Sequence, residues 1–150
     1  MKNKILVAAL LLLGTYALAQ EPAKEKESKK IDAPAVVKQA FQKDYPNVKK
    51  VDWSMENGDF EAEFTLNGAE ASANYDKAGL KKQFEIEIKT DQLPVSVLSY
   101  VKSNYAGYKL TEAAKITNDN NETIFEAEVS KGGKSLDLQF DTAGKFLKKD

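Results

Sequence analysis

The strongest constraint on the fold of this chain is that one sequence pattern occurs twice. The segment Phe-Glu-Ala-Glu-Phe at 60–64 returns as Phe-Glu-Ala-Glu-Val at 125–129, and Tyr-Asp-Lys-Ala-Gly at 75–79 returns as Phe-Asp-Thr-Ala-Gly at 140–144. Internal repetition of this kind is the sequence signature of a duplicated supersecondary unit. The repeated residues are mostly of core and turn types, so the pattern predicts architecture better than chemistry.

The first 19 residues have the pattern of a secretory signal peptide. A basic start with Lys2 and Lys4 precedes an apolar stretch at 5–13, and Ala17-Leu18-Ala19 supplies a cleavage site before Gln20. The alternative is an uncleaved anchor, but the apolar stretch is shorter than the roughly 20 residues that a spanning helix needs. Without cysteine the chain also lacks the attachment residue of a lipoprotein. We therefore expect an exported protein, periplasmic or secreted, with no membrane span after cleavage.

The segment 20–32 is rich in lysine and glutamate and has almost no apolar side chain to bury. Segments of this composition do not form a packed core. We expect a disordered charged linker at 20–32, with an electrostatic arm for the cell envelope as the alternative. The folded domain is then expected at 33–150, with repeats at 33–90 and 91–150.

The charge of the exported chain argues against polyanionic partners. Without Lys2 and Lys4 the 22 basic residues fall to 20, against 23 acidic ones, so the net charge is −3. All the basic residues are lysines, and no guanidinium fork is available for bidentate contact with phosphate. Nucleic acid is therefore not an expected partner.

Each repeat is expected to begin with a short helix. Proline suits the first turn of a helix, where a missing N–H has no partner to lose. Behind each proline, apolar side chains recur every fourth residue and form one stripe: Pro34, Val37, Phe41 and Tyr45 in the first repeat, and Pro94, Val97, Val101 and Tyr105 in the second. Such a stripe is typical of a helix face that packs on a sheet, although aromatic rings at this spacing can also line a ligand groove.

Four strands are expected after each helix, because apolar and polar residues alternate along 51–56, 60–67, 70–75 and 84–89. The corresponding strands of the second repeat are expected near 110–117, 123–131, 134–140 and 145–148. Short turns such as Asn57-Gly58 and Asn67-Gly68 favour hairpins and hence antiparallel neighbours.

The predicted fold class is α+β, as two tandem α-β4 repeats with the helices packed on one face of antiparallel sheet. One set of side chains is expected to be buried together between the helices and the sheet: Phe41, Trp53, Phe60, Phe64, Phe84, Val101, Phe125, Leu138 and Phe140.

Composition excludes most catalytic arrangements. The absence of histidine and cysteine removes His-based acid–base chemistry, cysteine nucleophiles and His/Cys zinc sites. Two carboxylate pairs share a strand face at i, i+2, Glu61 with Glu63 and Glu126 with Glu128. Such pairs can act as acid and base in glycoside hydrolysis. On an outer sheet face, however, they are more often solvated and paired with lysines across strands, so we expect no enzyme activity, no cofactor and no metal.

The loop at 118–122, Asn-Asp-Asn-Asn-Glu, has oxygen ligands of the kind that calcium prefers. It lacks the spacing of a known calcium loop, so a polar turn is expected. Asn121 lies in an N-glycosylation pattern and Thr142 in a bacterial O-glycosylation-like one, but turn chemistry accounts for both sites. The sequence leaves the use of Asn121 and Thr142 open.

The first repeat contains five short motifs: Pro-x-x-Val-x-x-Ala-Phe at 34–41, Tyr-Pro at 45–46, Val-x-Trp at 51–53, Asn-Gly-x-Phe-Glu-Ala-Glu-Phe at 57–64 and Tyr-Asp-x-x-Gly at 75–79. In this order they resemble the PepSY-like, β-lactamase-inhibitor-protein-like family of exported bacterial proteins. The resemblance extends over 31–150 and implies a helix-on-curved-sheet fold with a non-catalytic binding or inhibitory role. The namesake inhibitors have disulfides and this chain has no cysteine, and no inhibitory residue of theirs can be assigned here.

We therefore expect a non-catalytic binding module, an inhibitor or interaction protein whose partner is an envelope or extracellular protein. The partner is expected to meet the polar sheet face through its carboxylates: Glu61, Glu63, Glu85, Glu87, Glu126, Glu128 and Asp137. The alternative is a periplasmic accessory protein that binds a small ligand, a cation or a polysaccharide fragment. The identity of the partner and the oligomeric state do not follow from the sequence.

Overall fold

The computed structural model describes residues 30–150 of the chain. The predicted signal peptide at 1–19 and most of the predicted linker at 20–32 lie outside the described residues. The elements follow in the order α1 (Ala35–Asp44), β1 (Val51–Glu56), β2 (Asp59–Leu66), β3 (Ala69–Tyr75), β4 (Lys81–Glu87), the 3₁₀ turn η1 (Thr90–Gln92), α2 (Val95–Asn104), β5 (Lys109–Asn118), β6 (Thr123–Lys131), β7 (Lys134–Asp141) and β8 (Phe146–Lys149).

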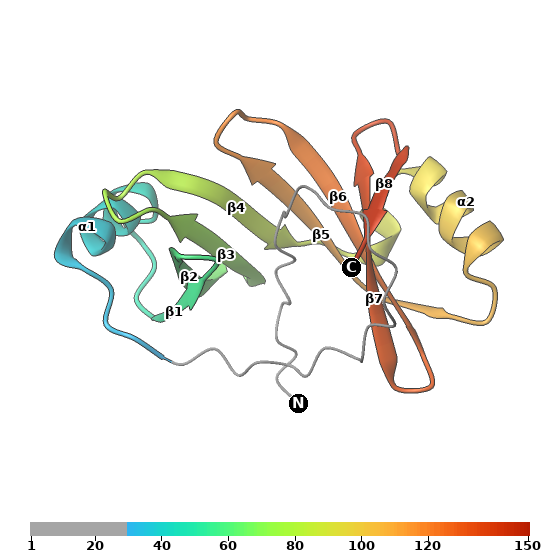
Figure 1. The fold of residues 1–150 in the computed structure, drawn as a ribbon, viewed down its shortest axis with the longest axis horizontal. Coiled ribbons are helices and arrows are strands. Elements are labelled where there is room, and N and C mark those ends of the chain that lie inside the picture. Colours follow the sequence, from blue (N-terminus) through green and yellow to red (C-terminus); the bar gives the residue numbers. More distant parts are fainter. Residues whose placement is uncertain (1–29) are drawn as a thin grey trace, which may run out of the picture.

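All eight strands form one antiparallel sheet in chain order, β1 to β8, with α1 near one end and α2 near the other (Figure 1). Ala71 pairs with Ile86, Ile86 with Lys115, and Lys115 with Phe125. Because directly opposed residues point to the same side of a sheet, this row places the residues that pack around α1 and around α2 on one face. The predicted α+β class, with an antiparallel sheet and two helices, is confirmed.

The residues in the hairpin turns explain the conformations of these turns. Asn57 and Gly58 have φ of 51° and 92°, which suits a type I′ turn whose twist matches the strands that it joins. The turn after β3 is closed differently, because the Asp76 carboxylate accepts hydrogen bonds from the backbone N–H groups of Ala78 and Leu80. Asp141 makes the same two contacts with Ala143 and Lys145 in the turn after β7.

The apolar side chains form two separate cores, which corrects the prediction of a single buried set. Phe41, Trp53 and Phe64 lie in a core under α1, whereas Val101, Leu138 and Phe140 lie in another under α2. The remaining three predicted residues are only partly buried: Phe60, Phe84 and Phe125.

The geometry of the elements explains the separation. A helix of 10 residues is about 15 Å long, whereas eight strands spaced about 4.8 Å apart extend over about 34 Å. Two short helices therefore cover the two ends of the sheet and leave the middle uncovered. The exposed side chain of Lys115 stands on the helix-side face at that point.

The described part of the chain begins at the edge of the sheet. The backbone N–H of Ile31 donates to the carbonyl of Trp53, and Lys30 forms an ion pair with Asp52 at 2.7 Å. The Ile31 side chain packs against the core under α1. The chain therefore enters the domain next to β1.

Candidate functional site

The seven carboxylates predicted to bind a partner all lie on the sheet face opposite the helices. Register brings them together: Glu63 is opposite Ser72, and Ser72 is opposite Glu85. Glu87 and Glu126 flank Ala114 from the two sides of β5, and Glu128 is directly opposite Asp137. We call this surface the acidic face; its carboxylates are Glu56, Glu61, Glu63, Glu85, Glu87, Glu112, Glu126, Glu128 and Asp137.

The acidic face is not the solvated surface that the strand alternation predicts. Glu85 is 0% exposed, and Glu61, Glu126 and Asp137 are 5–6% exposed. Among the predicted residues, Glu63 and Glu128 are half-buried and Glu87 is exposed. The carboxylates therefore form a buried floor with a more accessible rim.

The predicted cross-strand pairing with lysines is wrong for Glu61 and Glu126, the buried members of the two carboxylate pairs. Ser54 donates a hydrogen bond to Glu61 Oε2 at 2.9 Å, and the Gln139 amide donates to Glu126 Oε2 at 2.9 Å. The Asn74 amide donates to Glu56 Oε2 at 2.8 Å. Neutral hydroxyl and amide donors thus hold these carboxylates against the sheet.

Glu85 differs from its neighbours because neither of its carboxylate oxygens has a hydrogen-bond partner. The hydroxyl of Ser72, directly across from Glu85 on β3, is also buried without a partner. Buried polar groups in proteins are nearly always hydrogen-bonded, and leaving one unpaired costs about 1–3 kcal/mol. Two unpartnered groups in one cross-strand pair are therefore an unusual feature of this face.

Burial and mutual repulsion raise the pKa values of these acids. Burial raises the pKa of Glu85 to about 9, and the charges of Glu126 and Glu61 add to the effect. The pKa of Glu61 rises to about 7, chiefly through burial and then through Glu56. Burial likewise raises the pKa values of Glu126 and Asp137 to about 7. At neutral pH the floor of the acidic face therefore holds several protons that ordinary carboxyl groups would have released.

A small hollow of about 20 Å³ opens among these carboxylates. Glu85 and Glu126 line it with Glu87, Glu112, Glu128 and Asp137, and Ala114, on the same face, contributes only a small side chain. A volume of this size holds about one water-sized group. Among residues 30–150 there is no cluster of three or more acidic side chains with the arrangement of a metal site.

The sequence prediction missed the polar side chains that complete this face. These side chains alternate with core residues on strands next to those of the predicted carboxylates: Ser54 and Glu56 on β1, Ser72 and Asn74 on β3, and Gln139 on β7. Strand alternation alone could have assigned them to the acidic face. Their burial could not have been found in this way, because it depends on the packing of neighbouring strands.

A larger hollow of about 400 Å³ lies near the end of α1, between β4 and the β5–β6 turn. Tyr45, Leu66 and Phe84 give it an apolar part, and Gln83, Thr117, Asn118 and Asn121 give it neutral polar groups. Its two lysines are neutralised, Lys81 by Asp44 and Lys82 by Asp119.

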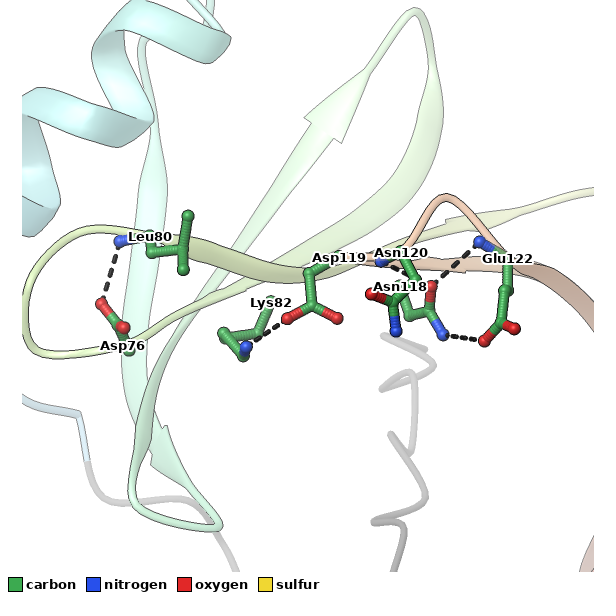
Figure 2. A network of polar contacts seen from close by, with 7 residues as sticks. All are labelled: Asp76, Leu80, Lys82, Asn118, Asp119, Asn120 and Glu122. Atoms are coloured by element: carbon green, nitrogen blue, oxygen red, sulfur yellow. Dashed lines mark hydrogen bonds and ion pairs between the residues drawn. The ribbon is translucent and has the colours of Figure 1, made fainter.

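The polar turn at 118–122 borders this hollow. Hydrogen bonds among its own residues hold the turn together. Figure 2 shows the Asn118 side chain accepting from the backbone N–H groups of Asn120 and Glu122 while its amide donates to the Glu122 carboxylate. Lys82 of β4 pairs with Asp119 of the same turn. The loop therefore acts as the polar turn that the sequence predicts, joined by an ion pair to the preceding half of the sheet.

Comparison with known proteins identifies the family. The sequence pattern of the family described as "Putative beta-lactamase-inhibitor-like, PepSY-like" matches residues 58–148. The chain belongs to this PepSY-like family. No protein among the curated sequences matches the chain.

Solved structures show the same fold as this PepSY-like protein. One, from Bacteroides eggerthii, is described as "putative periplasmic proteins"; it has a TM-score of 0.73 and 19% identity, and the match covers 79% of this chain and 88% of that one. A DUF2874 family protein from Bacteroides uniformis has a TM-score of 0.71 and 22% identity, with 79% and 88% covered. A BLIP-like protein from Bacteroides fragilis has a TM-score of 0.66 and 24% identity, with 80% and 86% covered.

These comparisons identify the architecture of the PepSY-like protein and none of its binding residues. No helix among residues 30–150 is long and apolar enough to cross a bilayer.

Proposed function

We propose that this PepSY-like protein is an exported, non-catalytic binding module whose acidic face meets a protein partner in the cell envelope or outside the cell. Export is supported by the signal-peptide pattern at 1–19 and by the description of a neighbour of the same fold as periplasmic. A non-catalytic role is supported by membership of an inhibitor-like family and by the absence of histidine and cysteine from the sequence.

The observation that carries the proposal is the group of buried carboxyl side chains on the acidic face, whose pKa values are raised because burial and neighbouring acids disfavour their ionised forms. Carboxylates from β2, β4, β6 and β7 are buried side by side, and Glu85 has no hydrogen-bond partner. A buried carboxyl group without a hydrogen-bond partner is costly in a folded protein, and strongly raised pKa values are common at functional sites. A partner with a basic surface would favour the ionised form of these buried acids and would be steered by the accessible carboxylates at the rim of the face.

We further infer that the domain at 33–150 consists of two copies of one α-β4 unit, at 33–90 and 91–150. Both helices have 10 residues and are followed by a tyrosine that caps the helix. The backbone N–H of this tyrosine donates to the carbonyl four residues earlier, Tyr45 to Phe41 and Tyr105 to Val101. The Asp76 and Asp141 turns also have identical hydrogen bonds. Shared caps and turns are what duplication of one unit would produce.

The proposal can be tested by capture of partners from envelope extract, with the chain from Gln20 immobilised. The variant Glu63→Gln/Glu128→Gln removes two half-buried carboxylates from the acidic face and is expected to slow association with the captured partner several-fold. The control Asp91→Asn removes an exposed carboxylate from η1, outside the strands, and should leave the association rate unchanged. Equal rates for all three proteins would exclude the acidic face as the binding surface.

The second candidate function is the binding of a small neutral ligand, such as a polysaccharide fragment, and one observation favours it. The hollow next to Tyr45 and Phe84 has a volume of about 400 Å³, which falls in the usual range of ligand sites. Aromatic rings beside uncharged amide and hydroxyl groups suit a sugar. Titration with oligosaccharides from envelope polymers tests this candidate: binding that Phe84→Ala abolishes and Glu63→Gln/Glu128→Gln leaves intact would favour it over the first.

A further inference from the structure

The hollow of the acidic face has the size and the charge for one particular group. It holds about one water-sized group in about 20 Å³, and six carboxylate side chains line it. A lysine ammonium is a compact cation with three N–H donors, whereas a guanidinium is a larger planar fork. The hollow therefore fits the ammonium better.

The floor of the hollow contains a buried carboxyl group that lacks hydrogen-bond partners, that of Glu85. Glu85 is 0% exposed, and both of its oxygens are buried without a hydrogen-bond partner. An N–H donor that entered the hollow could donate the hydrogen bonds that these two oxygens lack. Glu87, two residues along the same strand, is exposed and leaves the rim accessible from solvent.

We propose that the acidic face binds its protein partner by taking a lysine side chain into the hollow, with the ammonium group above Glu85. This inference rests on the proposed function and specifies the chemistry of the partner. The divalent-cation alternative is weaker because the described residues show no cluster with the arrangement of a metal site. The occupant is a lysine of another protein rather than a free polyamine.

Lysine binding at this site releases protons. The acids whose charges act on Glu85 come from strands on both sides of β4: Glu56 on β1, Glu61 on β2, Glu126 on β6 and Asp137 on β7. Glu87 of β4 itself and Glu112 of β5 line the same hollow. Burial and these neighbours raise the pKa of Glu85 to about 9. An ammonium group stabilises the ionised form, so binding should strengthen as the pH rises toward the pKa of Glu85.

The test is calorimetric titration of the chain from Gln20 with a hexalysine peptide at pH 6 and pH 8.5. We expect at least tenfold tighter binding at pH 8.5, with proton release measured as a dependence of the heat on the buffer. Glu85→Gln should weaken binding at least tenfold at pH 8.5 and remove most of the pH dependence. Glu87→Gln removes the same formal charge from the rim and should weaken binding less than threefold.

A second variant keeps every carboxylate and closes the hollow. Ala114 lies between Glu87 and Glu126 and is 7% exposed. Ala114→Val should fold, because β-branched residues suit strands, and it should weaken hexalysine binding at least tenfold. Hexa-arginine should bind at least fivefold more weakly than hexalysine to the native protein, and a hexapeptide of Nε-acetyl-lysine should not bind.

Several outcomes would overturn the inference. Equal losses for Glu85→Gln and Glu87→Gln would mean diffuse charge attraction instead of a lysine site. If calcium ions bound more tightly than hexalysine, and Glu85→Gln weakened their binding at least tenfold, the hollow would be a metal site. The same result with spermidine would make it a polyamine site. A dimer in sedimentation that Glu85→Gln abolishes would assign it to a second copy of this chain.

The failure of this inference is distinguishable from the failure of the proposed function. If hexalysine does not bind but a captured partner still depends on Glu63 and Glu128, the acidic face binds protein without a lysine in the hollow. If partner capture is also independent of these two residues, both proposals are wrong.

Discussion

Replacing Glu85 by glutamine is expected to stabilise the protein at neutral pH and to have little effect in mild acid. The folded protein keeps the Glu85 carboxyl protonated, because its pKa is raised from 4.5 to about 9 by burial and by the nearby acids. The unfolded chain has an ordinary glutamate that is ionised above about pH 4.5. Folding above that pH must therefore take up a proton at Glu85, and stability falls as the pH rises toward 9.

The size of the effect follows from the same values. Taking up the proton costs about 1.4 kcal/mol for each pH unit above 4.5, hence roughly 3 kcal/mol at pH 7 and less than about 1 kcal/mol at pH 5. Glutamine is neutral at every pH and avoids this cost. Its amide brings two donors into a buried site, which offsets about 1 kcal/mol of the gain. We expect Glu85→Gln to raise the free energy of unfolding by about 2 kcal/mol at pH 7 and to change it by less than about 1 kcal/mol in either direction at pH 5.

Urea unfolding followed by circular dichroism, at pH 5 and pH 7, measures this difference. Glu87→Gln is the matched control, because it makes the same substitution at an exposed position of the same strand. The control should change the free energy of unfolding by less than about 0.5 kcal/mol at either pH. A stability gain for Glu85→Gln that is the same at both pH values, or a loss at pH 7, would refute the assignment of a proton to Glu85.

Three further expectations concern the scaffold and are checked by urea unfolding at pH 7. Tyr75→Phe removes a buried hydroxyl that donates to Asp44 Oδ2 at 3.0 Å and should cost about 1.5–3 kcal/mol; no loss would mean that this bond is absent. Gly144→Ala should cost more than Gly132→Ala, since both need positive φ but only the first would press a Cβ against the start of α2; equal costs would contradict that packing. Phe140→Ala should cost about 3–5 kcal/mol, and a cost below about 1 kcal/mol would contradict the core under α2.

The sequence alone determined the strands, the turns and the two faces of the sheet. These features depend on neighbours in the chain: alternation fixes which residues share a face, and Asn-Gly pairs fix hairpins because they accept positive φ. The carboxylates Glu61 and Glu126 were therefore assigned to the correct face without any knowledge of the tertiary structure.

Only the tertiary structure decided how those strands combine and what environment the carboxylates meet. The register between β4 and β5 joins the halves into one sheet wider than two short helices can cover, so the apolar residues divide into two cores instead of one. Alternation predicts a solvated outer face, whereas packing between strands buries Glu85 completely and leaves it unpartnered. The pKa of Glu85 depends on this burial and on charges brought close from β1, β2, β6 and β7. Proximity between strands distant in the chain is a property that local sequence does not encode.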